Sequence, residues 1–124
     1  MPALQTQTQT ITDKVLALPL GIHVKDFLDY LTIEAGLANN TILAYGRDLT
    51  SFLKYCKSNN IKDLHQLNPA LIQQYMIILS KASRAETSMK RCIAAIRMFL
   101  RFATLNNLIK DNFSAVLESP KLWQ

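Results

Sequence analysis

The sequence predicts an all-α domain with four principal helices and a short fifth. Apolar residues recur at intervals of three and four along several stretches, as on one face of a helix, and the alternation typical of a strand appears nowhere. Short segments rich in Asn, Gly and Pro separate these stretches. Apolar residues make up 49% of the 124-residue chain, which is enough for the core of one domain.

Residues 1–20 are predicted to be a flexible leader, because they begin with a Gln-Thr alternation of low complexity. Pro19 and Gly21 would interrupt a helix at its end, although the apolar run from Val15 to Leu20 could lie on the domain. We expect the helical domain to cover residues 21–118. Residues 119–124 would then begin a linker to a further domain.

The first predicted helix runs from about His23 to Ala35, and Gly36 ends it. Asn39 or Asn40 caps the second, which continues to about Ser58. The inward-facing residues are Val24, Phe27, Leu28 and Leu31 on the first helix, and Ile42, Tyr45, Leu49, Phe52, Leu53 and Cys56 on the second. Gly46 within the second helix either admits a close backbone neighbour or is merely tolerated.

The third predicted helix begins with Asn68 as its cap and Pro69 at its first position, and continues to about Ser80. Its inward-facing residues are Leu71, Ile72, Tyr75, Met76 and Leu79. The fourth helix has Thr87 and Ser88 at or just inside its start and ends near Asn106. A short turn from Ser114 to Glu118 completes the set.

Positive charge is concentrated on the fourth helix and the loop before it. The chain has a net charge of +5, and the segment from Lys81 to Arg101 holds six cations against the single acid Glu86, which accounts for the whole excess. At 100° per residue, one side of this helix collects Met89, Cys92, Ile93, Ile96, Phe99 and Leu100, and the far side collects Lys90, Arg97 and Arg101, with Arg91 on their flank. Localised positive charge indicates nucleic acid or an anionic surface, and the alternative is an ordinary solvated face.

The motifs of common enzymes are missing from the sequence, which has no Gly-rich phosphate loop, GxSxG or HExxH. His23 and His65 are isolated, and Cys56 and Cys92 are predicted to be buried thiols without metal or disulfide. We therefore expect no cofactor and no metal. No run of apolar residues is long enough to span a membrane and the N-terminus is no signal peptide, so a cytoplasmic protein is expected.

Binding to nucleic acid is the function that the remaining residues favour. Lys90, Arg97 and Arg101 follow one line about 16 Å long, and Thr87 and Ser88 stand where a phosphate would meet free backbone N–H groups. Asn40 and Thr41 repeat this arrangement at the start of the second helix, with Arg47 further along. A simple capping role is the stronger expectation for Asn40, and phosphate contact and packing are equally open for Thr41.

Four motifs in this order resemble one family. Residues 36–49, GLANNTILAYGRDL, resemble the G-L-x-x-N-T-x-x-A-Y-x-R-D-L signature of the N-terminal, core-binding domain of tyrosine recombinases, the Xer and phage-integrase group. The segment FLDYL at 27–31 is similar to the F-L-x-x-L that opens these domains. The helix from Arg91 to Phe99 is similar to their R-x-x-S-A-x-R-x-F helix, and SPKL at 119–122 matches the close of the domain.

The resemblance implies a SAM-like orthogonal bundle of four or five helices that clamps one face of a recombination-site duplex. A separate catalytic domain of the same parent chain would clamp the other face, and other recombinase protomers would join in a synaptic complex. Helices two and four approach the major groove in this family. The matching positions Thr41, Arg47, Arg91 and Arg97 become candidates for contact with double-stranded DNA, and Thr87 and Ser88 match the hydroxyl-rich start of the fourth helix. Lys90 and Arg101 join them from the helical face alone.

The sequence departs from the family pattern at two positions. Gly46 stands where a second basic residue is common, and Ala94 replaces a common serine. The family's catalytic Arg, Lys, His-x-x-Arg and nucleophilic Tyr belong to the C-terminal domain, and the tyrosines here, Tyr30, Tyr45, Tyr55 and Tyr75, all fall inside predicted helices. We therefore expect no strand cleavage by this chain and a tyrosine recombinase as its parent. The alternative is a helical protein-interaction module whose basic helix docks an acidic partner.

Overall fold

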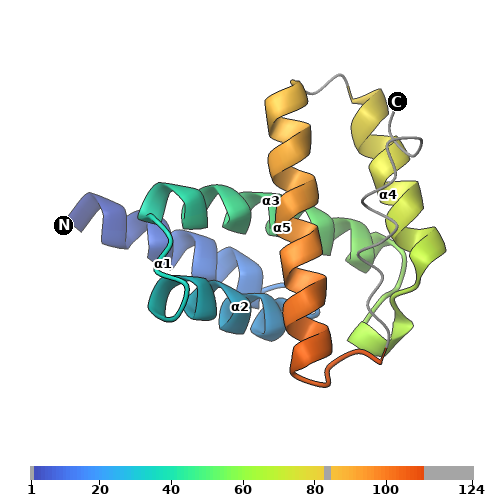
Figure 1. Ribbon diagram of the computed structural model, residues 1–124, viewed down its shortest axis with the longest axis horizontal. Helices are drawn as coiled ribbons and strands as arrows, with labels where there is room; N and C mark the ends of the chain where they lie inside the picture. The colour runs from blue at the N-terminus through green and yellow to red at the C-terminus, as the bar shows by residue number, and fades with distance from the viewer. Residues whose placement is uncertain (1, 83–84, 111–124) are drawn as a thin grey trace. The chain divides into compact units, whose positions relative to one another are not determined.

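The computed structural model of the chain describes residues 2–82 and 85–110, with side chains from Gln9 onward. All regular elements in these ranges are helices, so the predicted all-α class is confirmed. The chain divides into two compact units, Met1–Lys62 and Asp63–Gln124. Figure 1 shows α1, α2 and α3 in the first unit and α4 and α5 in the second. The turn predicted from Ser114 to Glu118 lies outside the described residues.

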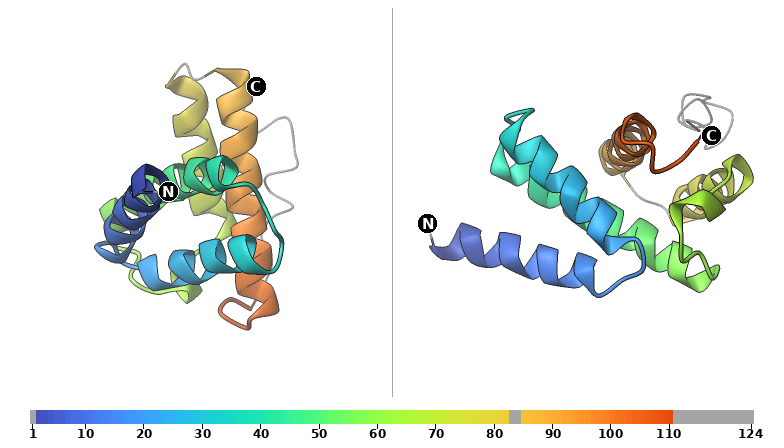
Figure 2. Two further views of the ribbon diagram at one scale, coloured as in Figure 1. Left: turned by 90° about the vertical axis from the view of Figure 1, so that its left-hand side faces the viewer. Right: turned by 90° about the horizontal axis from the view of Figure 1, so that it is seen from below.

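The first unit is a three-helix assembly of α1 (Pro2–Leu16), α2 (Gly21–Ile33) and α3 (Asn39–Ser58). Helix α1 packs against both α2 and α3, and α2 packs against α3, as the views in Figure 2 show. Gly36 follows α2 with φ of 65°, a left-handed conformation that ends the helix as predicted. The predicted inward-facing residues of these helices are buried, apart from Tyr45, which is half-buried.

Helix α1 is the main difference from the sequence prediction of a flexible leader over residues 1–20. The structure places Pro2–Leu16 in a helix, and Ile11 and Val15, one turn apart, are buried. The predicted docking of the apolar run is confirmed at Val15 and at Leu20, which is also buried. The threonines of the Gln-Thr repeat lower its helix propensity, and a short helix is marginal without tertiary contacts, so packing of this apolar edge stabilises the helix.

Two glycines allow α1 to lie close to its neighbours. A Cβ atom on Gly46 of α3 would come 2.6 Å from the Cγ2 atom of Ile11, so a larger residue there would force Ile11 to shift. A Cβ atom on Gly21 would come 1.8 Å from the carbonyl oxygen of Val15, which only glycine avoids at this tight connection. The close neighbour at Gly46 is thus the side chain of Ile11 and not a backbone, and this glycine is a contact point between α1 and α3.

The second unit begins with a 3-10 helix, η1 (Leu64–Gln66), which the sequence analysis did not predict. Asp63 caps it by accepting a hydrogen bond from the backbone N–H of His65 at 2.9 Å. Helix α4 (Pro69–Lys81) follows, and the Asn68 side chain accepts from the N–H of Leu71 at 2.9 Å. The predicted Asn-Pro start of this helix is therefore confirmed.

Helix α5 (Glu86–Leu105) has an apolar side and a charged side, as the sequence predicted. All six residues predicted to face inward are buried, together with Ala95 and Ala103. The helix ends where predicted, with Asn107 at φ of 58° and the N–H of Leu108 bonded to the carbonyl of Ala103 at 2.8 Å. None of the helices in the described ranges is long and apolar enough to cross a membrane.

Candidate nucleic-acid interface

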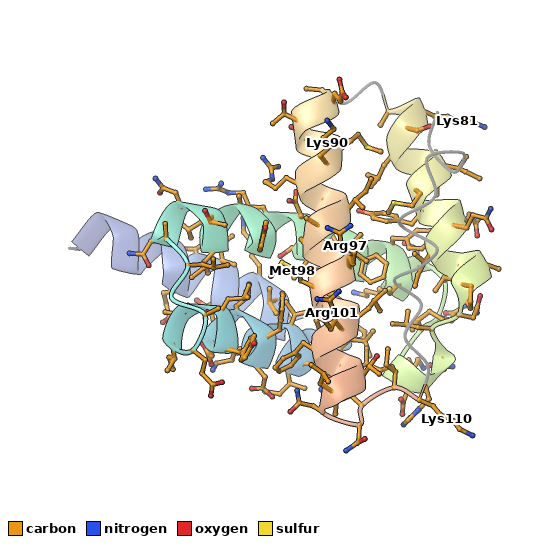
Figure 3. The ribbon with its side chains drawn as sticks, viewed as in Figure 1. Lys81, Lys90, Arg97, Met98, Arg101 and Lys110 are labelled. Carbon is orange, nitrogen blue, oxygen red and sulfur yellow. The ribbon has the colours of Figure 1, made fainter. Side chains whose placement is uncertain are left out.

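Three cations form a line on the exposed side of α5, and we call Lys90, Arg97 and Arg101 the α5 ridge. Lys90 and Arg101 are exposed and Arg97 is half-buried. Their spacing of seven and four residues keeps them within about 40° around the helix and spreads them over about 16 Å of its length. Figure 3 shows the three side chains along α5, with Lys81 and Lys110 lying away from them at the ends of the unit. The predicted basic face is present as a continuous row.

The members of the α5 ridge differ in their local partners. The Lys90 ammonium lies 3.3 Å from the Glu86 carboxylate, and the two side chains are 65% and 75% exposed. A surface pair of this kind contributes little to stability and exchanges readily for another anion. No carboxylate of the described residues lies within 4.0 Å of Arg97 or Arg101. The two guanidinium groups are therefore the stronger candidates for an external anion.

The other candidates on α5 surround the ridge. Thr87 and Ser88 are the second and third residues of the helix, as predicted, with Thr87 exposed and Ser88 half-buried. The N-cap residue, Ala85, supplies no side-chain hydrogen bond to the first turn. Arg91 is half-buried and already takes part in an interaction within the protein. The first-turn N–H groups and the two hydroxyls thus stand at one end of the ridge, and Arg91 lies on its flank.

Helix α3 carries the remaining candidates, Asn40, Thr41 and Arg47. Asn40 and Arg47 are exposed and share one side of the helix, whereas Thr41 is half-buried and points about 100° away. The prediction that Asn39 or Asn40 caps this helix is wrong. Ala38 is the N-cap without a side-chain hydrogen bond, because its extended backbone (φ −63°, ψ 147°) starts the helix at Asn39. Asn40 is consequently released from the capping role that the sequence favoured.

Lys54 extends this side of α3, although the sequence analysis did not place it in the site. It is exposed and follows Asn40 and Arg47 at the same seven-residue spacing, which keeps it within about 40° of them. We call Asn40, Arg47 and Lys54 the α3 line. The regular spacing alone would have identified Lys54 from the sequence, but no family motif drew attention to it.

Neither cysteine offers chemistry to this site. Both are free thiols and both are buried, as predicted. Burial raises the pKa of the Cys56 thiol to about 12, so this group stays protonated and unreactive near neutral pH. Across the described ranges, no group of three or more His, Cys, Asp and Glu side chains is placed to hold a metal ion. The arrangement is one of fixed cations and hydroxyls, which suits the binding of an anionic polymer.

Comparison with known proteins supports the resemblance seen in the sequence. The family described as phage integrase, N-terminal SAM-like domain, matches residues 24–107, which include all of α3, α4 and α5. No solved structure matches the chain. Helix α1 lies before the matched region, so the family comparison does not cover the segment that packs on Gly46.

Several curated relatives are tyrosine recombinases. The chain is 35% identical over 100 residues to tyrosine recombinase XerD of Halalkalibacterium halodurans, and this match covers 80% of the chain and 33% of the relative. The XerD protein of Vibrio cholerae is 35% identical over 99 residues, and tyrosine recombinase XerC of Leptospira interrogans is 32% identical over 104 residues. The chain spans about a third of the length of these relatives. With the SAM-like region matched from α2 to α5, the chain belongs to the family of phage-integrase N-terminal SAM-like domains.

Proposed function

We propose that this chain is the DNA-binding part of a site-specific tyrosine recombinase and that it holds one face of the recombination-site duplex. The observation that carries the proposal is the α5 ridge, in which Arg97 and Arg101 have no carboxylate partner among the described residues. The relatives named tyrosine recombinases support the same role. The parent protein would supply the strand-cleaving residues from its catalytic domain, and further protomers would complete the assembly.

The physical basis of binding is the exchange of small counterions for protein cations. A duplex condenses cations along its phosphates, and each Lys or Arg that replaces one releases it into solution. The α5 ridge offers three such groups within about 16 Å, and the α3 line offers two more. If four to six phosphates are neutralised, the logarithm of the binding constant falls with the logarithm of the salt concentration with a slope of about −4 to −5.

The phosphates near the start of α5 have a second type of ligand available. The first-turn N–H groups of an α-helix have no acceptor within the helix, and here the N-cap residue Ala85 supplies no side-chain bond to them. The hydroxyls of Thr87 and Ser88 stand in the same turn. We assign these groups to positioning the backbone of the duplex, since contacts to phosphate fix register without reading sequence.

The test is charge reversal on the α5 ridge. We expect Arg97→Glu combined with Arg101→Glu to abolish binding of a 30-base-pair duplex in a gel-shift assay at moderate salt, while the helical circular dichroism stays unchanged. Lys14→Glu combined with Lys57→Glu is the matched control, because it changes the net charge equally through two exposed lysines on α1 and α3. This control should weaken binding only slightly.

Three results would refute the proposal, two from the variants and one from a comparison with heparin. One is an unchanged duplex affinity in the variant with both arginines reversed. The other is equal loss in both double variants, which would reduce the effect to net charge. Heparin serves as a polyanion without bases or a helical groove. If the chain binds the duplex no more tightly than it binds heparin, its cations form an ordinary solvated basic face.

A further inference from the structure

Two apolar side chains lie beside the α5 ridge, on the side of the helix that faces away from the core. Ala94 follows Lys90 by four residues, and Met98 follows Ala94 by four, so the two are neighbours one turn apart. Both are half-buried. Figure 3 shows Met98 on the same stretch of α5 as Arg97 and Arg101. The exposed side of the helix therefore has a cationic row with an apolar pair along its edge.

The fully buried stripe of α5 does not include this pair, and the half-buried Phe102 lies between that stripe and Met98. The buried residues of α5 already form a complete stripe on the other side: Met89, Cys92, Ile93, Ala95, Ile96, Phe99, Leu100 and Ala103. At 100° per residue, Met98 lies about 60° from the nearest member of that stripe and about 60° from Arg101. A face that served only solubility or only phosphate contact would carry polar or cationic residues at these two positions.

The shape of a duplex explains such an arrangement, on the proposed function that α5 binds DNA. The major groove is about 12 Å wide and admits one α-helix, whose diameter is about 10–12 Å. The long side chains of the α5 ridge, on one side of the apolar pair, reach the phosphates on a groove wall. The shorter side chains beside the ridge face the base edges, and a residue as small as Ala94 lets the helix approach the groove floor closely.

The apolar group that a base pair presents in the major groove is the C5-methyl of thymine. We propose that Ala94 and Met98 face the base edges and that Met98 contacts a thymine methyl, which makes it a specificity-determining residue of this domain. A thioether on an unbranched side chain is polarisable and adapts its shape, so it suits a contact with one methyl group. The sequence preference that follows is for thymine at the contacted position. Guanine would be preferred there if an arginine read the base instead.

The experiment removes the C5-methyl group of thymine from the duplex without changing base pairing. The chain is first used to select duplexes from a pool with a randomised 30-base-pair segment, at moderate salt. In the enriched duplex, each thymine is then replaced singly by deoxyuridine, and the affinities of the wild-type chain, Met98→Ala and Met98→Leu are measured. Ile78→Ala is the matched control, since Ile78 is an apolar side chain of α4 that is 45% exposed and lies outside the α5 ridge.

We expect one or two thymines whose replacement weakens wild-type binding about three- to fivefold, the factor for losing one buried methyl group. Met98→Ala should bind the thymine and deoxyuridine duplexes equally, whereas Met98→Leu and Ile78→Ala should keep the wild-type preference. The inference is overturned if selection enriches no sequence, if no replacement weakens wild-type binding, or if Met98→Ala keeps the preference. In these cases the pool still binds, and the proposed function stands. A pool that does not bind at all would instead remove the proposed function.

Discussion

Helices α3 and α5 are built alike and expose different surfaces. Each has 20 residues, an alanine N-cap without a side-chain bond, and a buried apolar stripe. On α5 the side opposite this stripe carries the three cations of the ridge. On α3 the buried set also includes Gly46, which Ile11 of α1 approaches, and the polar residues Asp48 and Thr50. The exposed part of α3 is accordingly narrower, and the α3 line has two cations and one amide.

This difference shows how a neighbouring helix widens the buried side of a long amphipathic helix. Such a helix has one side for the core and one side for solvent or a ligand. On α3, α1 packs at Gly46, which lies within about 40° of Ile42 and Leu53 of the apolar stripe. The α3 line has two cations, whereas the α5 ridge has three. We therefore expect α5 to supply most of the DNA affinity and α3 to supply a smaller part.

The largest effect is expected where α1 meets α3. The Gly46→Arg substitution places a long side chain where the Ile11 Cγ2 atom would lie 2.6 Å from a Cβ. Overpacking of this kind costs about 1–3 kcal/mol, and the better helix propensity of arginine offsets up to about 1 kcal/mol of it. We expect the free energy of unfolding to fall by about 1–2 kcal/mol in urea denaturation followed by circular dichroism, with no gain in DNA affinity.

A coupled variant separates this clash from a general effect of arginine. Ile11→Ala removes the atoms that Gly46→Arg would meet, so the loss in the double variant should be smaller than the sum of the two single losses. Strict additivity would show that the two positions do not touch. A Gly46→Arg chain of wild-type stability that bound duplex more tightly would show that α1 leaves this side of α3 open.

The second effect compares one arginine from each helix. Arg101→Ala on the α5 ridge should weaken duplex binding about five- to tenfold at 0.1 M salt and make the salt slope less steep by about 0.9, as expected when one phosphate contact is lost. Arg47→Ala on the α3 line should weaken it only about two- to threefold. Fluorescence anisotropy titrations at several salt concentrations would measure both. An equal loss at Arg47 would mean that the two helices contribute equally to the DNA affinity, and a larger loss would mean that α3 contributes more.

Regular features of the fold could be predicted from the sequence because they depend on local patterns. The apolar stripe of α5 repeats at helical spacing, and the predicted cap of α4 by Asn68 forms its hydrogen bond to Leu71 at 2.9 Å. Helix α1 could not be predicted in the same way. The threonines of its Gln-Thr repeat are poor helix formers, and its stability comes from Ile11 and Val15 packing against residues distant in sequence.

The cap of α3 illustrates a different limit of the sequence. Asn39 and Asn40 are favourable capping residues, yet the helix begins one residue earlier than a cap at Asn39 would require and two earlier than a cap at Asn40, with Ala38 in the extended conformation. Propensity ranks the residues that can cap a helix, but the preceding connection decides where the helix begins. Within the site, helical periodicity predicted the row of Lys90, Arg97 and Arg101. The ion pair of Lys90 with Glu86 was identified only from the side-chain positions in the structure.

The smallest effect concerns that partner. Glu86 holds Lys90 at 3.3 Å and places a negative charge beside the α5 ridge, so Glu86→Gln should raise duplex affinity about two- to threefold at low salt, since screening weakens charge effects as salt rises. The same change should lower the free energy of unfolding by a few tenths of a kcal/mol, because an acid in the first turn interacts favourably with the helix dipole.

Asp29→Asn is the matched control. It removes an equal charge from the Lys25–Asp29 pair of α2, also four residues apart, in which the hydrogen bond that Lys25 donates to Asp29 raises the pKa of Lys25. A gain in affinity at Glu86 that exceeds the gain at Asp29 would place Lys90 at the DNA, and a loss at Glu86 would mean that the acid positions Lys90 for its phosphate.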